Sequence, residues 1–465
     1  MKGHNGEMSI HSGVNKRAVL LIAALSSFLT TFMGSAINIA LPSIGREFQM
    51  NAVLLGWVAT AYILASATCL LPFGRLADIY GRKRTLTSGI FIFTLASLIL
   101  AFAPSTTVLI ALRTVQGIGG AMIFTTGIAI LTSVFPAGER GKALGINAAA
   151  TYLGLSLGPV LGGLLTQHFG WQSIFLVVVP LGATIIALIF TKLRGEWAEA
   201  RGEKFDLTGS VIYGLALTGI IYGFSLLPAK LGIWLIILGA SGIFAFINRE
   251  AKVDSPLLDT NLFRQNRTFA FSNLAVLLNY SAGFAVGFLL SLYLQYIKGF
   301  SPQNAGLILV AMPIVQASFS PIAGRLSDRI EPRILASVGM GLIAVGLSLF
   351  ISLSEKTSLG LIIASLILIG LGFGFFASPN TNAIMSSVKQ RFYGVASATL
   401  ATMRQVGMSF SMGIAMLLFA IYIGKVEITP EYYSLFLSST RIAFIIFTAL
   451  CCGGVFASLA SGKTR

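Results

Sequence analysis

Two arginines lie inside long apolar stretches of this chain, where a permanent charge is unusual. Arg113 occurs in LIALRTVQGIGGA and Arg404 in ATMRQVG, and each has a glutamine close by, Gln116 and Gln405. A charge deep in a membrane-spanning segment costs about 2.5–3.5 kcal/mol or more, so such residues nearly always face a cavity or a polar partner. The alternative is an arginine whose long side chain reaches the polar boundary. The pattern predicts a polar site around these four residues.

A charged loop occurs twice. GRLADIYGRKR occupies residues 74–84, and its partial repeat GRLSDRIEPR occupies 324–333, each between long apolar runs. Asp78 lies where the chain leaves one helix and enters the next, and Asp328 matches it at one offset. A carboxylate there can accept N–H bonds from the loop, is favoured near the start of the next helix, and can pair with an arginine. The alternative is a loop whose basic residues only anchor the chain in the membrane.

The composition sets the class of protein that must position these residues. Of the 465 residues, 55% are hydrophobic and only 10% are charged, whereas soluble domains carry about 25% charged residues. Apolar runs of about 18 or more residues recur along the chain, which predicts an all-α polytopic membrane protein. The short alternating segments of a β-barrel are not the pattern seen here.

Fourteen membrane-spanning helices are expected from these runs. Their approximate bounds are 18–41, 53–73, 85–103, 106–134, 142–166, 172–192, 207–227, 231–248, 268–296, 303–324, 334–353, 358–385, 392–423 and 440–460.

The loops orient the chain. With both termini in the cytoplasm, most of the 32 Lys and Arg fall in cytoplasmic segments, as the positive-inside rule requires. The net charge of +16 is therefore assigned to contact with anionic lipid headgroups and not to nucleic acid. A multi-pass protein of the plasma membrane is expected.

The repeated loop predicts two related halves with the same orientation in the membrane, a known plan of transporters. A second pair, ERGKALG and QRFYGVA, aligns at nearly the same offset. The expected division has five parts: a cytoplasmic tail (1–17), a six-helix half (18–192), two linker helices with flanking loops (193–267), a second six-helix half (268–460) and a tail (461–465).

Several motifs together resemble the major facilitator superfamily over the whole chain from residue 18. The loop GRLADIYGRKR is similar to the signature between the second and third helices, and LIALRTVQGIGGA is similar to the helix-4 motif. GLSLGPVLGG resembles the helix-5 antiporter motif, while INIALP and ATMRQVG resemble signatures of the fourteen-helix drug:proton antiporter branch. The antiporter motif contributes Gly154, Gly158, Pro159, Gly162 and Gly163.

The resemblance implies roles for these residues. The loop is expected to latch one side of the transporter shut, together with a basic group from the other half. Arg113, Gln116, Arg404 and Gln405 are expected to serve transport or coupling, and the glycine-rich helix 5 is expected to bend at the interface of the halves; ordinary tight packing is the alternative. The latch residues are Gly74, Arg75, Asp78, Gly81, Arg82 and Asp328.

Polar residues within the spans are candidates for the lining of a substrate cavity. Hydrogen bonding between helices, without substrate contact, is the alternative for each of them. They are Asn38, Tyr62, Asn147, Tyr152, Asn279, Tyr280, Gln316, Asn380 and Asn382.

One feature departs from the family pattern. The branch usually carries an aspartate shortly before INIALP, and here Met33 or Gly34 stands in that place. Every Asp and Glu is expected in a loop or at a membrane edge, although proton relays normally use buried carboxylates or histidines. Asp78, or a group near Arg113, would have to carry a coupled proton. The two intramembrane arginines favour a neutral or anionic substrate.

The leading hypothesis is a monomeric efflux transporter of small amphipathic compounds that works by alternating access, uses the proton gradient and needs no cofactor. The alternative is an exporter of a specific neutral or anionic metabolite without proton coupling. A membrane enzyme, a channel and a sensor are disfavoured, because the sequence shows no catalytic or metal cluster, no symmetric filter, no Walker A pattern and no loop long enough for a soluble domain.

Overall fold

The computed structural model describes residues 15–253, 256–258, 260–327, 329–389 and 393–462. Within these residues, 14 helices or consecutive helix pieces are long and apolar enough to cross a membrane, which confirms the expected number. The helices are α1 (Lys16–Glu47), α2 (Ala52–Tyr80), α3 (Arg82–Leu100), α4 (Thr106–Val134), α5 (Ala137–Phe169), α6 (Ser173–Leu176), α7 (Val178–Lys192), α8 (Leu207–Leu226), α9 (Lys230–Glu250), α10 (Thr260–Gln265), α11 (Arg267–Gly283), α12 (Ala285–Leu292), α13 (Pro302–Leu309), α14 (Ala311–Leu326), α15 (Pro332–Leu349), α16 (Leu359–Ser386), α17 (Tyr393–Tyr422) and α18 (Tyr433–Ala460).

Several helices extend beyond the predicted bounds. The first span runs from residue 16 to residue 47 and not only over 18–41, and the last begins before residue 440. An apolar run marks the part of a helix that lies in hydrocarbon, whereas the helix itself continues into the polar boundary. Helix-capping side chains then set the ends, as Asn15 and Asn51 do by accepting from the backbone N–H groups of Ala18 and Leu54.

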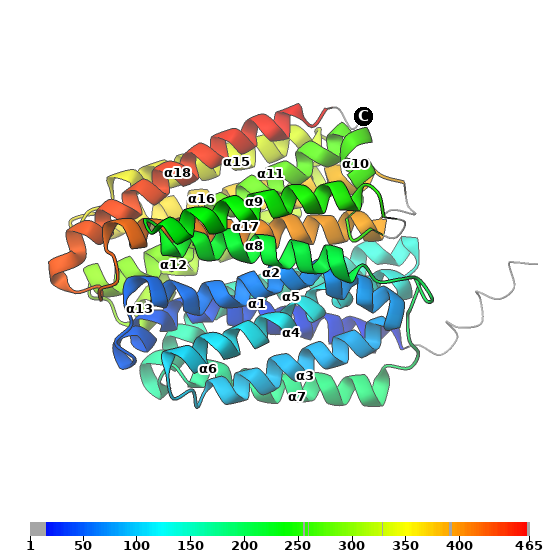
Figure 1. Cartoon of the computed structure of the whole chain (residues 1–465), viewed down its shortest axis with the longest axis horizontal. Helices are drawn as coiled ribbons and strands as arrows, with labels where there is room; N and C mark the ends of the chain where they lie inside the picture. The colour runs from blue at the N-terminus through cyan, green and yellow to red at the C-terminus, as the bar shows by residue number, and fades with distance from the viewer. Residues whose placement is uncertain (1–14, 254–255, 259, 328, 390–392, 463–465) are drawn as a thin grey trace, which may run out of the picture.

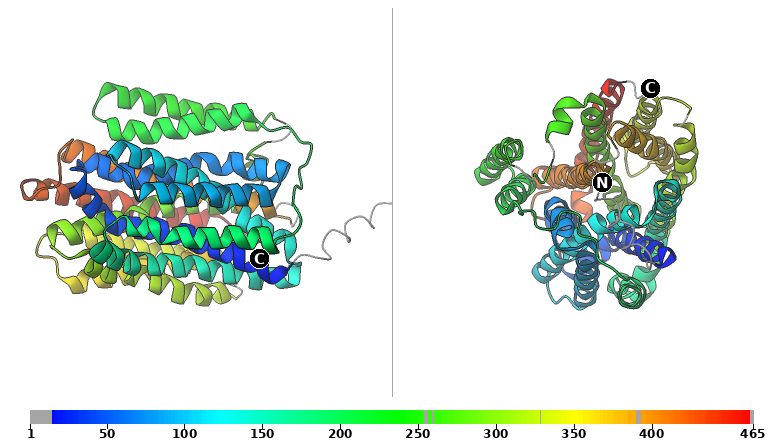
Figure 2. Two further views of the ribbon diagram at one scale, coloured as in Figure 1. Left: turned by 90° about the horizontal axis from the view of Figure 1, so that it is seen from below. Right: turned by 90° about the vertical axis from the view of Figure 1, so that its right-hand side faces the viewer.

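The helices form two groups with a pair at the side. We refer to α1–α7 as the first half and to α11–α18 as the second half. Figure 1 shows α8 and α9 side by side, and Figure 2 shows this pair at the edge of the bundle. The two extra helices are thus central in the sequence but peripheral in space. We call the end of the bundle that carries Lys16 and Ala460 the terminal end, and the other the opposite end.

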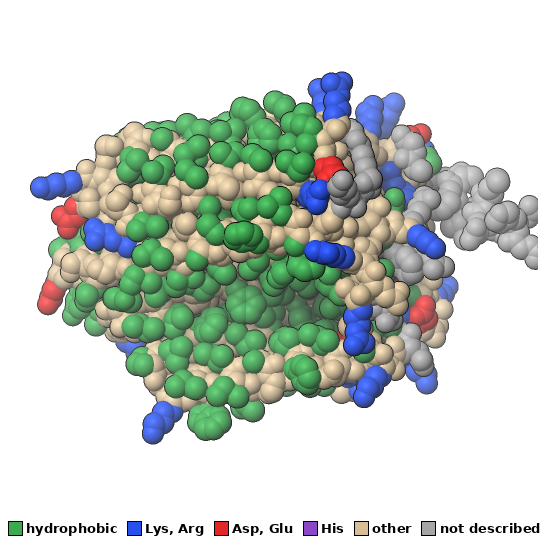
Figure 3. All heavy atoms as spheres, turned by 90° about the horizontal axis from the view of Figure 1, so that it is seen from above, with side chains coloured by type: hydrophobic (Ala, Val, Ile, Leu, Met, Phe, Trp, Pro, Cys, Tyr) green, Lys and Arg blue, Asp and Glu red, His purple; other side chains and the backbone are tan. Residues whose placement is uncertain are grey.

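The surface matches a lipid environment. Figure 3 shows a broad belt of hydrophobic side chains, with Lys and Arg gathered at the ends of the bundle and most densely near the terminal end. Phe102, Phe190 and Phe456 are each more than 70% exposed. Large apolar side chains at that exposure are stable in hydrocarbon and not in water.

Glycines of the helix-5 motif allow close packing of α5. A Cβ on Gly158 would lie 2.6 Å from Cβ of Ser35, and one on Gly162 would lie 2.9 Å from Cα of Ala36. On another side of α5, a Cβ on Gly163 would lie 2.5 Å from the carbonyl oxygen of Pro302 in α13. Small residues therefore bring α5 against α1 in its own half and against α13 in the other half.

The two halves meet most closely toward the opposite end. Ser291 Oγ of α12 donates to the carbonyl of Asn38 at 2.6 Å, and Gln295 Nε2 donates to the carbonyl of Ile39 at 3.0 Å. Toward the terminal end, the last side-chain hydrogen bonds between the halves among the described residues are those of Ser66 in α2 and of Tyr152 at mid-length of α5.

Replacing Gly306 of α13 by valine is expected to prevent this close approach. A Cβ on Gly306 would clash with the backbone carbonyl of Pro159, and overpacking of this kind costs about 1–3 kcal/mol. We expect a lower melting temperature and slower transport. Gly341→Val in α15 is the control, because no heavy atom lies within 4 Å of the corresponding Cβ. Equal effects of the two substitutions would contradict the packing argument.

Candidate functional site

Arg113 lies about two turns from the start of α4 and is 1% exposed. Its Nε donates to the carbonyl oxygen of Val58 at 2.9 Å, and its Nη1 donates to Oε1 of Gln116. The guanidinium carbon lies 4.6 Å from the centre of the Tyr62 ring. Gln116 in turn donates to Ser97 Oγ at 2.7 Å. The guanidinium is thus held by neutral oxygens and an aromatic face.

This network joins three helices of the first half. Val58 and Tyr62 belong to α2, Ser97 to α3, and Gln116 to α4. No ion pair of Arg113 occurs among the residues that the structure describes. The prediction from sequence linked Arg113 with Gln116 and gave Tyr62 separately as a cavity candidate, and the structure brings the three into contact. The serine was missed, because a lone serine in an apolar run carries no distinguishing signal.

Arg404 has a different environment at about one-third of the length of α17. Its guanidinium carbon lies 5.5 Å from the centre of the Tyr280 ring of α11, and its Nε is buried without a hydrogen-bond partner. Tyr152 of α5 lies within range of electrostatic interaction with both Tyr280 and Arg404. The Tyr152 hydroxyl is 2.9 Å from Ser320 Oγ of α14. We call Tyr152, Tyr280, Ser320 and Arg404 the Arg404 cluster.

The cluster draws on both halves, and a further hydrogen bond between the halves lies at mid-length of α2. Gln405 Nε2 of α17 donates to Ser66 Oγ of α2 at 2.7 Å. Gln405 and Arg404 are adjacent in sequence but serve different contacts, because neighbouring residues of a helix point in directions about 100° apart. Polar groups at this depth therefore respond directly to any separation of the halves.

Three cavity candidates are used for hydrogen bonds within one half, which was the alternative considered for them. The pairs join Asn147 to Ser27, Asn380 to the carbonyl of Ser272, and Asn382 to Ser327, at 2.9, 3.2 and 3.0 Å.

Two other candidates, Asn279 and Asn38, keep unused polar atoms, and a third, Gln316, is buried. Asn279 is fully buried, and neither its amide oxygen nor its amide nitrogen has a partner. The side-chain oxygen of Asn38 is likewise buried and unpartnered. Gln316 of α14 is 8% exposed. Buried amide groups without partners are costly, so Asn279 and Asn38 have hydrogen-bonding capacity to spare.

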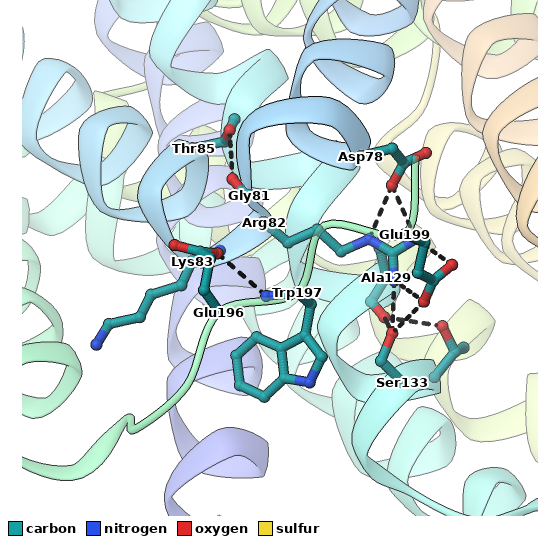
Figure 4. A network of polar contacts seen from close by, with 11 residues as sticks. Asp78, Gly81, Arg82, Lys83, Thr85, Ala129, Ser133, Glu196, Trp197 and Glu199 are labelled. Atoms are coloured by element: carbon teal, nitrogen blue, oxygen red, sulfur yellow. Dashed lines mark hydrogen bonds and ion pairs between the residues drawn. The ribbon is translucent and has the colours of Figure 1, made fainter. Parts of the chain in front are cut away.

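Arg82 is the centre of a charge network at the terminal end (Figure 4). Its Nε donates to Asp78 Oδ1 at 2.9 Å, and its two terminal nitrogens donate to the two carboxylate oxygens of Glu199 at 2.7 and 2.9 Å. Nη1 also donates to Ser133 Oγ at 2.5 Å. The forked contact with Glu199 is the geometry that arginine makes best with a carboxylate.

Glu199 belongs to the segment between α7 and α8, and we call residues 196–203 the acidic segment. Its backbone pairs with the loop: Arg82 N donates to the Trp197 carbonyl at 2.8 Å, and Ala200 N donates to the Asp78 carbonyl at 2.9 Å. Glu203 forms an ion pair with Arg75. Figure 4 shows this segment passing beside the start of α3.

Glycine at position 81 is required by this arrangement. Gly81 has φ +124°, and a Cβ there would lie 2.6 Å from Glu196 Oε1. That oxygen accepts from the backbone N–H of Lys83 at 2.7 Å, at the start of α3, where a negative charge is favoured. The carboxylate that caps this helix thus comes from Glu196 and not from Asp78.

The predicted partner of the latch was a basic group from the other half. In the structure, Asp78 pairs with Arg82 of its own loop, and the described partners of the loop come from its own half and the acidic segment. Asp328, the matching residue of the second copy, lies outside the described residues. The acidic segment was missed because its glutamates are spaced as in any solvated loop, and only folding brings them to the arginines.

Electrostatics favours the charged form of Glu199. Burial opposes ionisation of this carboxyl, but hydrogen bonds and the charge of Arg82, with help from Ser133 and Arg140, outweigh it and lower its pKa. A carboxyl with a lowered pKa contributes stability that is present above its ordinary pKa and is lost as the pH falls through the lowered value. The contact is therefore intact at neutral pH.

Acidic residues of the described spans all lie near helix ends. Glu47 and Glu250 are the last residues of their helices, and Asp78 and Glu139 lie two residues from an end. No Asp or Glu occupies the middle of a described span. The arginines that lie about two turns or more inside a described span are Arg113, Arg404 and Arg441, and no carboxylate lies at a comparable depth.

Comparisons with known proteins agree with this architecture. The family model described as Major Facilitator Superfamily matches residues 23–248 and 272–462. The riboflavin transporter RibZ of Clostridioides difficile is 34% identical over 403 residues, covering 86% of this chain and 87% of the relative. The multidrug resistance protein Stp of Mycobacterium tuberculosis is 30% identical over 404 residues, covering 85% of this chain and 74% of the relative.

A third relative, the cephamycin export protein CmcT of Amycolatopsis lactamdurans, is 33% identical over 406 residues, covering 85% of this chain and 83% of the relative. Among solved structures, a bacterial homologue of the human lysosomal transporter Spinster, inward-facing and unoccupied, has a TM-score of 0.66 at 18% identity, covering 96% and 97% of the two chains. The protein is a multi-pass membrane protein that belongs to the Major Facilitator Superfamily of transporters.

Proposed function

We propose that the protein is a secondary active transporter that exports small amphipathic compounds by alternating access. The observation that carries this proposal is the pattern of contact between the halves: they pack tightly toward the opposite end, and polar groups of both halves meet at mid-depth. A site at the middle of the membrane, between two repeats that rock against each other, is the general plan of such transporters.

The moving bodies of the proposal are residues 18–192 and 268–460, with the terminal end facing the cytoplasm. The density of Lys and Arg at that end supports this orientation. The names of the relatives support export: one is a multidrug resistance protein and another a cephamycin export protein. Another relative is named as a riboflavin transporter, which supports transport of a small organic molecule.

The network around Arg82 serves as a latch in this proposal. It fixes the turn between α2 and α3 to the acidic segment, and so makes the terminal end of the first half rigid. Gly74, Arg75, Asp78, Gly81 and Arg82 contribute to it. A rigid end lets the half rotate as one body, which alternating access requires.

The energy source in this proposal is the proton gradient, and the proton acceptor is Asp78. It is the acidic residue of the latch that lies inside a span, two residues from the end of α2. Among the described residues, Arg113 forms no ion pair with an acidic side chain. Its surroundings therefore provide no carboxylate that could accept the proton.

The test is efflux from proteoliposomes with and without an imposed pH gradient, using matched cationic, neutral and anionic dyes. We expect dye movement that follows the gradient, stops when a protonophore collapses it, and is lost in Asp78→Asn. The control variant is Arg17→Gln, because Arg17 is exposed near the start of α1 and takes no part in the ion pairs of the latch, so this change is expected to leave transport unchanged. Transport that ignores the gradient would remove proton coupling from the proposal, and absence of transport for every dye would remove export of amphipathic compounds.

A second candidate is export of a specific neutral or anionic metabolite without proton coupling. The observation that favours it is the charge of the described spans away from the helix ends, where Arg113 and Arg404 occur but no carboxylate does. The same dye panel separates the candidates, because this one predicts that cationic dyes are not transported.

A further inference from the structure

Two intramembrane arginines are held in opposite ways. Arg113 is 1% exposed, and its guanidinium contacts a backbone carbonyl, a glutamine oxygen and a tyrosine ring. Arg404 is only partly buried, contacts the ring of Tyr280, and has a buried Nε with no hydrogen-bond partner. The protein supplies oxygen acceptors to Nε and Nη1 of the first arginine, whereas Nε of the second is left without an acceptor.

The charge of Arg404 is not balanced by the described protein around it. No ion pair includes it, and acids of the described spans lie at helix ends. A partly desolvated guanidinium between packed helices is costly unless an anion pairs with it. The missing counter-charge is therefore expected from a bound molecule.

The groups beside Arg404 suit an anion with a flat apolar body. The Tyr152 hydroxyl, 2.9 Å from Ser320 Oγ, can donate to a ligand oxygen while it accepts from the serine. The ring of Tyr280 lies 6.0 Å from that of Phe373, which provides an aromatic surface next to the charge. A guanidinium offers two parallel N–H donors to a carboxylate.

We propose that the Arg404 cluster binds the carboxylate of a planar aromatic acid, with Arg404 as the charged ligand of the head group. This inference rests on the proposed transport function and specifies the substrate class of its central site. Because Tyr152 and Ser320 come from different halves, the bound anion also contacts the interface that opens and closes during transport.

The test is equilibrium dialysis of the purified protein in lipid nanodiscs with two probes of equal shape, naphthalene-2-carboxylate and naphthalene-2-carboxamide, at pH 7. A carboxylic acid is ionised at this pH, so the probes differ mainly in charge. We expect the wild type to bind the carboxylate at least tenfold more tightly. Arg404→Gln is expected to remove that preference while keeping affinity for the amide, and Arg404→Lys is expected to keep part of it.

Arg441→Gln is the matched control, because Arg441 already donates from its Nε to the Leu353 carbonyl at 2.6 Å, in a different part of the second half. It is expected to keep the full preference for the carboxylate. Equal binding of both probes by the wild type, or an undiminished preference in Arg404→Gln, would overturn the inference and leave export of amphipathic compounds standing. Binding of neither probe, together with no transport of any dye in proteoliposomes, would overturn both.

Discussion

Arg113→Lys is expected to destabilise the protein by about 1–3 kcal/mol or more, the range for buried polar groups that lose their hydrogen-bond partners. The lysine keeps the charge but not the planar fork, so it cannot replace the Nε contact with Val58, the contact with Gln116 and the stacking on Tyr62 together. Arg113→Met is expected to cost less, because it removes the buried charge as well as the contacts. The conservative substitution is therefore the more damaging one.

The measurement is thermal unfolding of the purified variants in one detergent, followed by the loss of the monodisperse peak in gel filtration. Arg441→Lys provides a comparison for the same chemical change at a partly buried arginine with a single backbone contact. It is expected to stay within about 1 kcal/mol of wild type, the value of one ordinary hydrogen bond. A lysine variant that melts later than the methionine variant would contradict the argument.

Arg82→Gln is expected to release the acidic segment and to slow transport at least tenfold. The substitution removes the cation that holds Asp78, Ser133 and Glu199 together and leaves the two carboxylates facing each other. Amide hydrogens at 82 and 200, which bond across the contact, are expected to exchange at least tenfold faster, equivalent to about 1.4 kcal/mol. Hydrogen–deuterium exchange with peptide mapping measures this change.

A double-mutant comparison isolates the contact. Glu199→Gln alone is expected to weaken it less than Arg82→Gln, since Asp78 and Ser133 still bind the arginine, and the two together are expected to cost less than the sum of the single changes. Fully additive effects on exchange would show that Arg82 and Glu199 act independently. Unchanged exchange but slower transport would assign Arg82 a role other than holding the segment.

The fold was predictable because its signals are long and redundant. Fourteen apolar runs and a repeated loop together led to the observed architecture. The helix ends were less predictable, since hydrophobicity reports the hydrocarbon layer and not the caps at Asn15 or Asn51. The peripheral position of α8 and α9 could not be derived either, because their apolar composition fits many places around a bundle.

Residues of the site were predictable only where a side chain is energetically costly inside a membrane-spanning helix. A charge in an apolar run is energetically costly, and this drew attention to Arg113 and Arg404. The structure then separated them, because Nε of Arg113 has an acceptor and Nε of Arg404 has none. Ser97, Ser66 and Ser320 were missed, since serine is inexpensive in a helix. The partner of Arg82 was missed because long-range pairing of loop charges depends on the folded path of residues 193–206.

Because α8 and α9 lie at the periphery, two sides of the bundle that face lipid differ in how they are covered. The halves meet along two seams, α2 with α17 and α5 with α13 and α14. Helix α8 covers the first seam: Tyr213 donates to the Ala67 carbonyl of α2 at 3.0 Å, and Phe224 packs against Gly413 of α17. Beside the second seam, Leu153 of α5 and Leu307 of α13 are more than half exposed. A hydrophobic molecule dissolved in the bilayer therefore meets a seam covered by α8 on one side of the bundle and an uncovered seam on the other.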